Sequence, residues 1–365
     1  MKVIVEIAIA ICVIVVSISG CKNDRMRKET VLVGDKVAQW QMDNFTYSFL
    51  PKAHWANAAL YRGMAEWAEC TNSDRIFAWL TKIGEDNSWG MLPRIYDADD
   101  LCIGQLYLKL FLRDGDSTKI AAVKERMDYV IDNRDFSPLR NPANGKYYRD
   151  RWGWCDALFM APPVYAGMFE VEQDDKYLDF CFEEYQVTVD SLFDRDDGLF
   201  YRDLTLVEDR EPNGKKVFWG RGNGWVYAGL CLMLETVPES HPSYAYYKSL
   251  YMDMTDPVVN CQDVSGSWHA GMYDPKTWKA PENSASGFFV YGLAWGVNHG
   301  LLKGEKYENA VRKGWNALKS YVQEDGKLGY VQPIGHSPVG VDADMTAPYG
   351  VGAFLLAASQ IMKMQ

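Results

Sequence analysis

One acidic residue near the middle of the chain lies in a setting that suits proton transfer. Asp156 follows Trp152 and Trp154, and an apolar run with helical character begins directly after it, at Ala157. Indole rings exclude water, and a carboxyl group shielded from water has a raised pKa and stays protonated closer to neutral pH. Asp156 is therefore a candidate general acid. The alternative is a structural role, in which Asp156 caps the helix that begins at Ala157.

A second polar segment, 218–225, lies at the start of another predicted helix. Its glycines allow close approach of the backbone, and Asn223 can cap the helix. Arg221 offers a forked pair of donors that suits a carboxylate. The alternative is an ordinary helix start with a surface arginine. The segment does not predict a nucleotide-binding phosphate loop, because the Lys-Ser/Thr ending of that pattern is missing.

Two adjacent carboxylates, Asp99 and Asp100, open a further predicted helix, where the helix dipole alone favours acidic residues. One of them can also contact a sugar hydroxyl or the candidate acid, and we favour Asp99. His269 follows Trp268 in a loop flanked by glycine, although a single histidine is more often structural. No two histidines have HxxxH or HExxH spacing, so the sequence predicts no metal site. The GxSxG motif of serine hydrolases is also missing.

The composition sets broad limits on the class of protein. The chain has 365 residues, of which 48% are apolar, and this is enough for a substantial hydrophobic core. Its net charge is -11 and it has no basic run, so we expect no nucleic-acid partner. An anionic substrate would have to be held by a few local cations. Aromatic residues make up 14% of the chain, and such rings stack on the apolar faces of sugars as well as filling cores.

Residues 1–20 have the form of a bacterial secretory signal. A charged start at Lys2 precedes an almost continuous apolar run over 3–16, and Ile18-Ser19-Gly20-Cys21 resembles a lipobox. The apolar run is too short to predict a transmembrane helix. We therefore expect Cys21 to become a lipidated N-terminus, with residues 21–34 as a tether. The protein would then lie in the bacterial cell envelope, in the periplasm or at the outer-membrane surface, with the lipid as its only membrane contact.

Helical periodicity recurs through residues 35–365 with turn-rich breaks between the helices. No linker rich in Pro, Gly or Ser divides this part, which indicates one domain. About twelve helices in antiparallel pairs can close as six hairpins around a ring, so we predict an all-α (α/α)6 barrel whose longer loops gather at one mouth. The predicted helices are 35–48, 55–70, 74–83, 97–112, 118–131, 152–172, 175–192, 220–236, 244–254, 284–300, 307–321 and 346–363, with strand-like pieces at 198–203 and 329–331.

Together these segments resemble glycoside hydrolase family 105, the unsaturated rhamnogalacturonyl hydrolases, and more distantly the unsaturated glucuronyl hydrolases of family 88. The resemblance implies an (α/α)6 barrel that removes a 4,5-unsaturated uronic acid from the non-reducing end of oligosaccharides left by polysaccharide lyases. It also implies that no cofactor is needed. The matching segments are 98–104, 152–160, 219–225, 266–269, 282–286, 329–335 and 349–354, which occur in the expected order.

The resemblance assigns the general acid and base to Asp156. It implies hydration of a vinyl ether, in which Asp156 protonates C4, positive charge develops at C5 and the ring oxygen, and water adds at C5. One proton donor then replaces the two carboxylates of ordinary glycosidases. Asp99 is implied to assist near the sugar. The residues implied to contact the substrate are Asp100, Trp152, Trp154, Trp219, Arg221, Asn223, Trp225, Trp268 and His269.

The chain departs from the family at one place. Some members have a substrate-binding histidine just before the Trp152 segment, and here Lys146, Tyr147 or Tyr148 would have to replace it. Rhamnose is the expected neighbouring sugar, although relatives act on fragments of other acidic polysaccharides such as ulvan. Two other classes stay open. Another α/α-barrel sugar enzyme, such as an epimerase or an inverting glycosidase, predicts activity on saturated sugars, and a glycan-binding lipoprotein predicts binding without turnover.

Overall fold

The computed structural model of the protein describes residues 25–45, 47–140, 144–145 and 149–364. Regular structure in these ranges is helical except for a small antiparallel ribbon of β1 (Phe193–Asp194) and β2 (Leu199–Phe200). Helical backbone over 25–43 comes first. The helices that follow are α2 (Trp55–Thr71), α3 (Asp74–Asp86), α4 (Ala98–Leu101), α5 (Gly104–Asp114), η1 (Ser117–Lys119), α6 (Ala121–Asp132), α7 (Ala157–Met160), α8 (Pro162–Glu172), α9 (Lys176–Leu192), α10 (Gly220–Thr236), α11 (Pro242–Asn260), α12 (Asn283–Asn298), α13 (Glu305–Ser320) and α14 (Pro348–Lys363).

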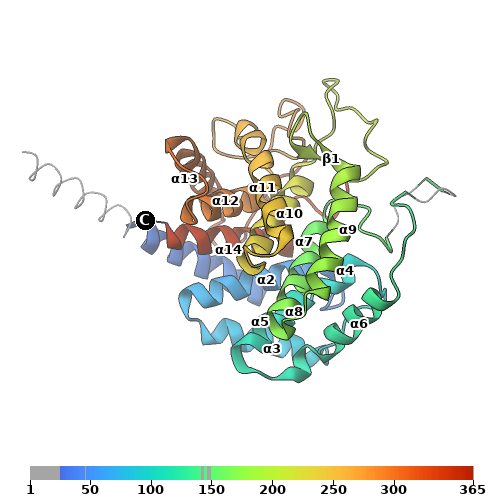
Figure 1. The fold of residues 1–365 in the computed structure, drawn as a ribbon. Coiled ribbons are helices and arrows are strands. Elements are labelled where there is room, and N and C mark those ends of the chain that lie inside the picture. The colour runs from blue at the N-terminus through green and yellow to red at the C-terminus, as the bar shows by residue number, and fades with distance from the viewer. Residues whose placement is uncertain (1–24, 46, 141–143, 146–148, 365) are drawn as a thin grey trace, which may run out of the picture.

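The longer helices form two concentric layers. The inner layer is a ring in which α2, α5, α8, α10, α12 and α14 each pack against the next, and α14 returns to α2. Figure 1 shows this closure, with the red α14 beside the blue α2. The helices α3, α9, α11 and α13 pack on the outside of α2, α8, α10 and α12. The predicted all-α (α/α)6 barrel is therefore confirmed.

The sequences of the helices explain which layer each one joins. Inner helices such as α12 are apolar around their whole circumference, and this is the pattern of a helix buried on every side. Outer helices bury one face only. In α13 the buried residues include Ala310, Gly314 and Leu318, which recur every four residues and form one stripe toward the ring. The contrast between the two patterns places the core between the layers and inside the ring.

We expect Gly352→Ala to destabilise the barrel. The inner helices α14 and α2 approach so closely that a Cβ atom on Gly352 would lie 2.4 Å from the carbonyl oxygen of Ala59 and 2.9 Å from the Cα of Leu60. These are backbone atoms, so α2 itself would have to shift, at a cost of about 1–3 kcal/mol. Urea denaturation measures this change. A matched control is Gly340→Ala, because a Cβ there meets nothing within 4 Å. Equal urea midpoints for the two variants would contradict the prediction.

Two predicted helices are divided in the structure. The predicted helix 97–112 is split into α4 and α5, and 152–172 begins only at Ala157 and is interrupted at Ala161. The second break follows from Pro162, which has no backbone N–H to donate but suits the first position of a new helix. The strand-like reading of 329–331 was wrong, because Tyr330 has a left-handed backbone with φ 56°. It donates its N–H to the carbonyl of Asp342 instead of joining a ladder.

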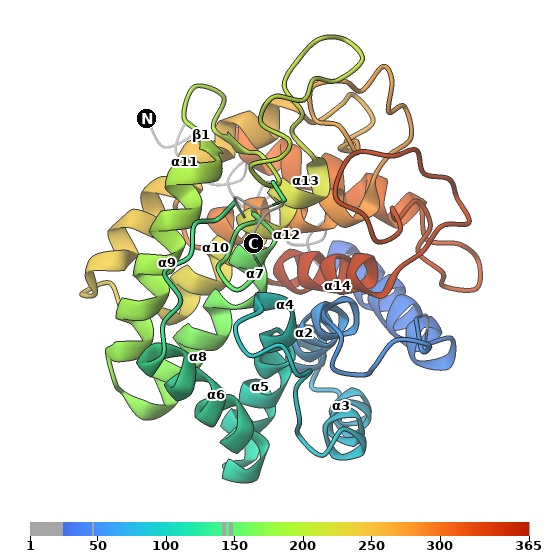
Figure 2. The ribbon, with the colours of Figure 1, turned by 90° about the vertical axis from the view of Figure 1, so that its right-hand side faces the viewer.

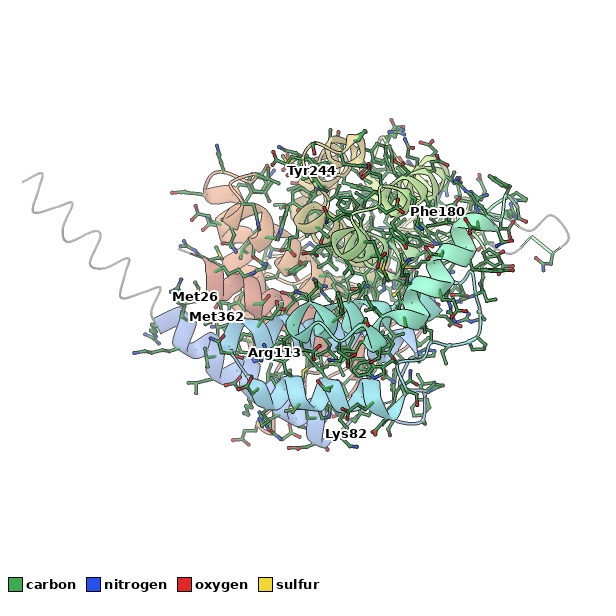
Figure 3. The ribbon with its side chains drawn as sticks, turned by 60° about the horizontal axis from the view of Figure 1, so that its bottom comes forward. Met26, Lys82, Arg113, Phe180, Tyr244 and Met362 are labelled. Carbon is green, nitrogen blue, oxygen red and sulfur yellow. The ribbon has the colours of Figure 1, made fainter. Side chains whose placement is uncertain are left out.

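The N-terminal part of the described chain differs from the predicted tether. Residues 25–34 are helical, Thr30 is buried, and Gly34 packs against the indole of Trp67. Figure 3 shows Met26 near this start and Met362 near the end of α14 at the same edge of the molecule. The predicted signal 1–20 and lipidated Cys21 lie outside the described residues. Among the residues described, no helix has the length and hydropathy needed to cross a bilayer.

The other end of the ring carries the longer loops. In Figure 2 the inner helices surround the short helices α4 and α7, and the long connections after β2, α11 and α13 lie on this side. The inner helices all begin here, so their first turns and the loops before them face one space. This arrangement brings together residues that are more than a hundred positions apart in the sequence.

Candidate active site

A cavity of about 500 Å³ opens at the end of the ring where α4 and α7 lie. Its volume falls in the range of about 300–1,000 Å³ that is usual for small-molecule sites. Charged and aromatic side chains dominate its wall. The lining residues are Trp55, Asp99, Arg149, Trp154, Asp156, Met160, Arg202, Asp203, Thr205, Trp219, Arg221, Ile334, Gly335 and His336.

Asp156 lies in the wall of this cavity and is held by the segment before it. Trp154 forms an isolated antiparallel bridge with Asp203, and the Cys155 N–H donates to the carbonyl of Arg202 at 2.8 Å. Asp156 then directly precedes α7, but its side chain makes no capping hydrogen bond to that helix. The capping alternative is therefore not what the structure shows. Asp156 is 8% exposed, and its side chain lines the cavity.

The surroundings of Asp156 favour its protonated form. Burial raises the pKa of this carboxyl above its ordinary value, and the guanidinium groups of Arg202 and then Arg221 offset part of the rise. Arg202 is the nearer of these cations, with its Nε 3.4 Å from Asp156 Oδ2. A carboxylic acid that keeps its proton toward neutral pH, beside a cation that can stabilise its anion, can both give and take a proton.

Asp99 lies on α4, lines the same cavity and pairs with Arg149. The Arg149 Nη2 donates to Asp99 Oδ2 at 2.5 Å, and its Nε donates to Asp97 Oδ2 at 2.6 Å. The guanidinium also lies over the ring of Trp154, 4.9 Å from the centroid. Burial and then the Asp97 carboxylate raise the pKa of Asp99 to about 7, against the effect of Arg149. Two carboxyl groups that titrate above their usual range therefore share this cavity.

Trp219 and Arg221, at the start of α10, also line the cavity. The fork of Arg221 does not point to an open carboxylate site. Its Nη1 donates to the carbonyl of Gln332 at 2.5 Å and its Nη2 to that of Pro333 at 3.0 Å. Trp219 Nε1 donates to Gln332 Oε1 at 3.0 Å. Both residues thus fasten the loop that brings Ile334, Gly335 and His336 to the cavity.

Asp100 and Trp152 lie outside the cavity wall. Asp100 is fully buried, and its carboxylate accepts hydrogen bonds from the backbone N–H and the guanidinium of Arg94. Trp152 packs against the rings of Tyr165 and Phe180 behind the wall. Direct contact with a sugar in this cavity is not expected of either residue. Their positions suggest that they hold the loops that carry Asp99 and Asp156.

Asn223 and Trp225, both on α10, are also buried away from the cavity. Asn223 Oδ1 accepts from the Phe200 N–H at 2.7 Å, and its Nδ2 donates to the Phe200 carbonyl at 3.0 Å, so it ties β2 to the helix. Trp225 is 1% exposed and packs between Phe159 and Phe288. These two residues therefore belong to the packing around α10 and not to the cavity wall.

The predicted pair of Trp268 and His269 lies in a separate buried loop. Trp268 Nε1 donates to the Val258 carbonyl at 2.7 Å. The His269 ring nitrogens lie 3.1 Å from Asp263 Oδ2 and 3.0 Å from the Ala280 carbonyl. Neither side chain lines the cavity. These hydrogen bonds attach the loop to the rest of the barrel. His269 therefore has a structural role here, which is the more frequent role of a single histidine.

Several lining residues were not among the predicted site residues. They are Trp55, Arg149, Met160, Arg202, Asp203, Thr205, Ile334, Gly335 and His336. The charged pair Arg202-Asp203 at the end of the predicted strand-like piece 198–203 was a usable signal, because inter-helix loops carry the sites of such barrels. The predicted carboxylate partners Lys146, Tyr147 and Tyr148 lie outside the described residues. Within the described ranges, no group of three or more His, Cys, Asp or Glu side chains is placed to hold a metal ion.

Comparison with known proteins agrees with this fold. The sequence model described as Glycosyl Hydrolase Family 88 matches residues 33–365. Proteins named unsaturated 3S-rhamnoglycuronyl hydrolase, from Alteromonas sp. (strain LOR) and Formosa agariphila, are 36% and 35% identical to this chain. Each match covers 90% of this chain, with 85% of the first relative and 89% of the second.

A solved structure gives the same result. The structure titled as a glycosyl hydrolase family 88 protein from Bacteroides vulgatus superposes with a TM-score of 0.83 at 29% identity. The superposition covers 92% of this chain and 99% of that one. The chain therefore belongs to glycosyl hydrolase family 88 and is a glycoside hydrolase.

Proposed function

We propose that this glycoside hydrolase releases a 4,5-unsaturated uronic acid from the non-reducing end of oligosaccharides made by polysaccharide lyases. The position of Asp156 carries the proposal: a buried carboxyl with a raised pKa at the wall of an open cavity. The indole rings of Trp55, Trp154 and Trp219 line the same cavity and offer faces for the CH groups of a sugar. A uronate also needs positive charge, which the lining arginines supply.

The chemistry requires one group that first gives and then accepts a proton. Asp156 donates its proton to C4, the electrons of the C4=C5 double bond form the new C–H bond, and positive charge is shared by C5 and the ring oxygen. A water molecule adds at C5, and the proton that it loses passes to the Asp156 carboxylate. The resulting hemiketal opens by cleavage of the bond between C5 and the ring oxygen, which leaves a ketone at C5 and a hemiacetal at C1. The hemiacetal then becomes an aldehyde and expels the neighbouring sugar as its alcohol. Asp156 is then protonated again and ready for the next turnover.

We further propose that rhamnose is the sugar next to the unsaturated uronate. The names of the two relatives from Alteromonas and Formosa support this, because both describe rhamnoglycuronyl hydrolases. The cavity also supports an anionic substrate. Arg149, Arg202 and Arg221 lie in its wall together with Asp99, Asp156 and Asp203, so cations are present locally although the whole chain carries a net charge of -11.

The purified protein is expected to consume the double bond of lyase-generated unsaturated disaccharides, followed as loss of their ultraviolet absorbance. The test set contains rhamnose-linked disaccharides, with and without sulfate on rhamnose, and disaccharides with other neighbouring sugars. Turnover is expected to be highest for a rhamnose-linked member. Saturated disaccharides serve as the control. Hydrolysis or epimerisation of these alone would favour another α/α-barrel sugar enzyme, and binding without loss of absorbance would favour a glycan-binding protein.

We also propose that the protein is anchored to the cell envelope by lipid on Cys21. The lipobox-like Ile18-Ser19-Gly20-Cys21 supports this. The first described helix, blue in Figure 1, starts at the end of the ring opposite α4 and α7, so an anchor attached there leaves the mouth of the cavity open to oligosaccharides. Metabolic labelling with a palmitate analogue tests the anchor, and a Cys21→Ala variant is expected to lose the label.

A further inference from the structure

Two chain segments that are far apart in the sequence are joined directly beside Asp156. The backbone of Cys155 donates its N–H to the carbonyl of Arg202, and Trp154 pairs with Asp203 in an antiparallel bridge. The residue before Asp156 and the residue Arg202 are therefore fixed to each other through the main chain. Any shift of one side chain relative to the other has to come from side-chain rotation alone.

The side chain of Arg202 is itself held in place. Its Nη1 donates to Asp203 Oδ2 at 2.7 Å. The other carboxylate oxygen of Asp203 accepts hydrogen bonds from the backbone N–H of Thr205 at 2.8 Å and from its hydroxyl at 2.5 Å. Arg202 is 9% exposed, and its Nε lies 3.4 Å from Asp156 Oδ2. Thr205, Asp203 and Arg202 thus form a chain of contacts that ends on the candidate acid.

The remaining charges near Asp156 cannot replace Arg202. Arg221 contributes positive charge from the start of α10, but both of its Nη groups are engaged by backbone carbonyls. The carboxyl groups of Asp99 and Asp203 are the acidic neighbours, and their charge disfavours a second anion. The buried thiol of Cys155 lies 3.8 Å away and carries no positive charge. Arg202 is therefore the cation in direct ion-pair contact with Asp156 among the described residues.

We propose that Arg202 is a positioning residue that keeps the Asp156 side chain turned into the cavity and stabilises its carboxylate once the proton has moved to the sugar. This inference rests on the proposed function. Asp156 is neutral before proton transfer and anionic after it, so a fixed cation at 3.4 Å favours the later state over the earlier one. The same cation then holds the carboxylate in place while it accepts the proton from water.

The test compares Arg202→Gln with wild type over a range of pH. A nearby cation lowers the pKa of a carboxyl by about 1–3 units, so its removal lets Asp156 keep its proton to higher pH. The alkaline limb of the activity profile is expected to move up by about one pH unit, and kcat to fall at least about tenfold, because a weaker acid transfers its proton less readily. Arg202→Lys keeps the charge and is expected to leave the alkaline limb close to that of wild type.

The control is Arg151→Gln. Arg151 is 8% exposed and its Nε lies 2.6 Å from Glu184 Oε2, so its removal also breaks a buried ion pair, but it does not line the cavity. This variant is expected to lose stability without moving the alkaline limb. An alkaline limb that stays in place in Arg202→Gln, or that moves equally in Arg151→Gln, overturns the inference.

A second measurement separates this inference from the proposed function. Carbon-13 NMR of labelled aspartate follows the titration of Asp156 without substrate, and the signal is assigned by its loss in Asp156→Asn. Arg202→Gln is expected to raise the titration midpoint, and an unchanged midpoint overturns the inference even if the enzyme is fully active. Arg202→Met serves the same test if the glutamine variant does not fold. Failure of the proposed function is seen separately, as wild-type protein that does not consume the double bond.

Discussion

Asp156→Asn is expected to lower kcat/KM on an unsaturated disaccharide by about 10²–10⁴-fold, the usual contribution of a positioned proton-transfer group. Asparagine has nearly the same shape as aspartate but can neither give the proton to C4 nor accept one from water. KM is expected to change little, because the arginines and indole rings of the cavity are kept. The measurement is loss of the double-bond absorbance at several substrate concentrations.

A suitable control is Asp100→Asn. Asp100 is also a buried carboxylate in an ion pair at the mouth of the barrel, with Arg94, but it lies outside the cavity. Its loss is expected to reduce stability more than kcat. Full activity of Asp156→Asn, or equal loss of kcat in both variants, would contradict the role of Asp156 as the acid.

The stability of Asp156→Asn should depend on pH in the opposite sense from the loss of an ordinary salt bridge. Burial raises the folded-state pKa of Asp156, so its contribution to stability is full below the unfolded pKa and is lost as pH rises through the folded pKa. The neutral amide carries no such dependence. Urea midpoints of the variant relative to wild type should therefore be higher at pH 8 than at pH 5.

The fold class could be predicted from the sequence because helix periodicity is a local property. The inner and outer helices differ in how far their apolar residues extend around the helix. This difference can be recognised in the sequence without knowing which helices pack against each other. The breaks were less visible. Pro162 and Pro163 indicated that a helix ends just before them. The division between α4 and α5 near Cys102 is not preceded by a proline or a glycine that would indicate it.

The site was predicted only where the chemistry of a residue is visible in its local sequence. Asp156, Asp99 and Trp154 all line the cavity, because each lies in a loop or first turn at the mouth. Trp225 and Trp268 have the same aromatic character but point into the core, and one turn of helix separates Trp225 from the lining residue Arg221. Residues four apart share a face of a helix, so Trp225 differs from Arg221 in its depth below the mouth and not in the side of the helix that it occupies. A sequence shows that an aromatic side chain is present at a helix start but not how far along the helix the cavity extends.

The position of Arg202 beside Asp156 could not be predicted from the sequence. Its place beside Asp156 depends on the pairing of residues 154–155 with 202–203, which are almost fifty positions apart. Two-residue bridges of this kind have no periodicity that a sequence pattern could show. The fork of Arg221 was similarly predicted to suit a carboxylate, whereas its donors meet two backbone carbonyls of a loop that lies more than a hundred residues later.

Arg221→Leu is expected to lower the free energy of unfolding by about 2–4 kcal/mol, since a buried charged donor with several hydrogen bonds is lost and buried acceptors are left behind. The Pro333 carbonyl loses its bond from Arg221, whereas the Gln332 carbonyl keeps the one that the Tyr349 hydroxyl donates at 2.6 Å. The stacking of the guanidinium on Trp219, 4.4 Å from the ring centroid, is lost as well. Urea denaturation measures the change.

Arg221→Leu should also change the shape of the cavity, because the loop that Arg221 holds contributes Ile334 and His336 to the cavity wall. We expect kcat/KM to fall mainly through a higher KM, since substrate binding needs that wall whereas Asp156 and its pairing with Arg202 stay in place. Arg221→Lys should recover little, because an ammonium group cannot reach two carbonyls with a planar fork. Arg195→Leu is the control, an arginine 69% exposed in a surface ion pair. If Arg221→Leu unfolded at the same urea concentration as this control, the loop would have to be held by Trp219 and Tyr349 alone.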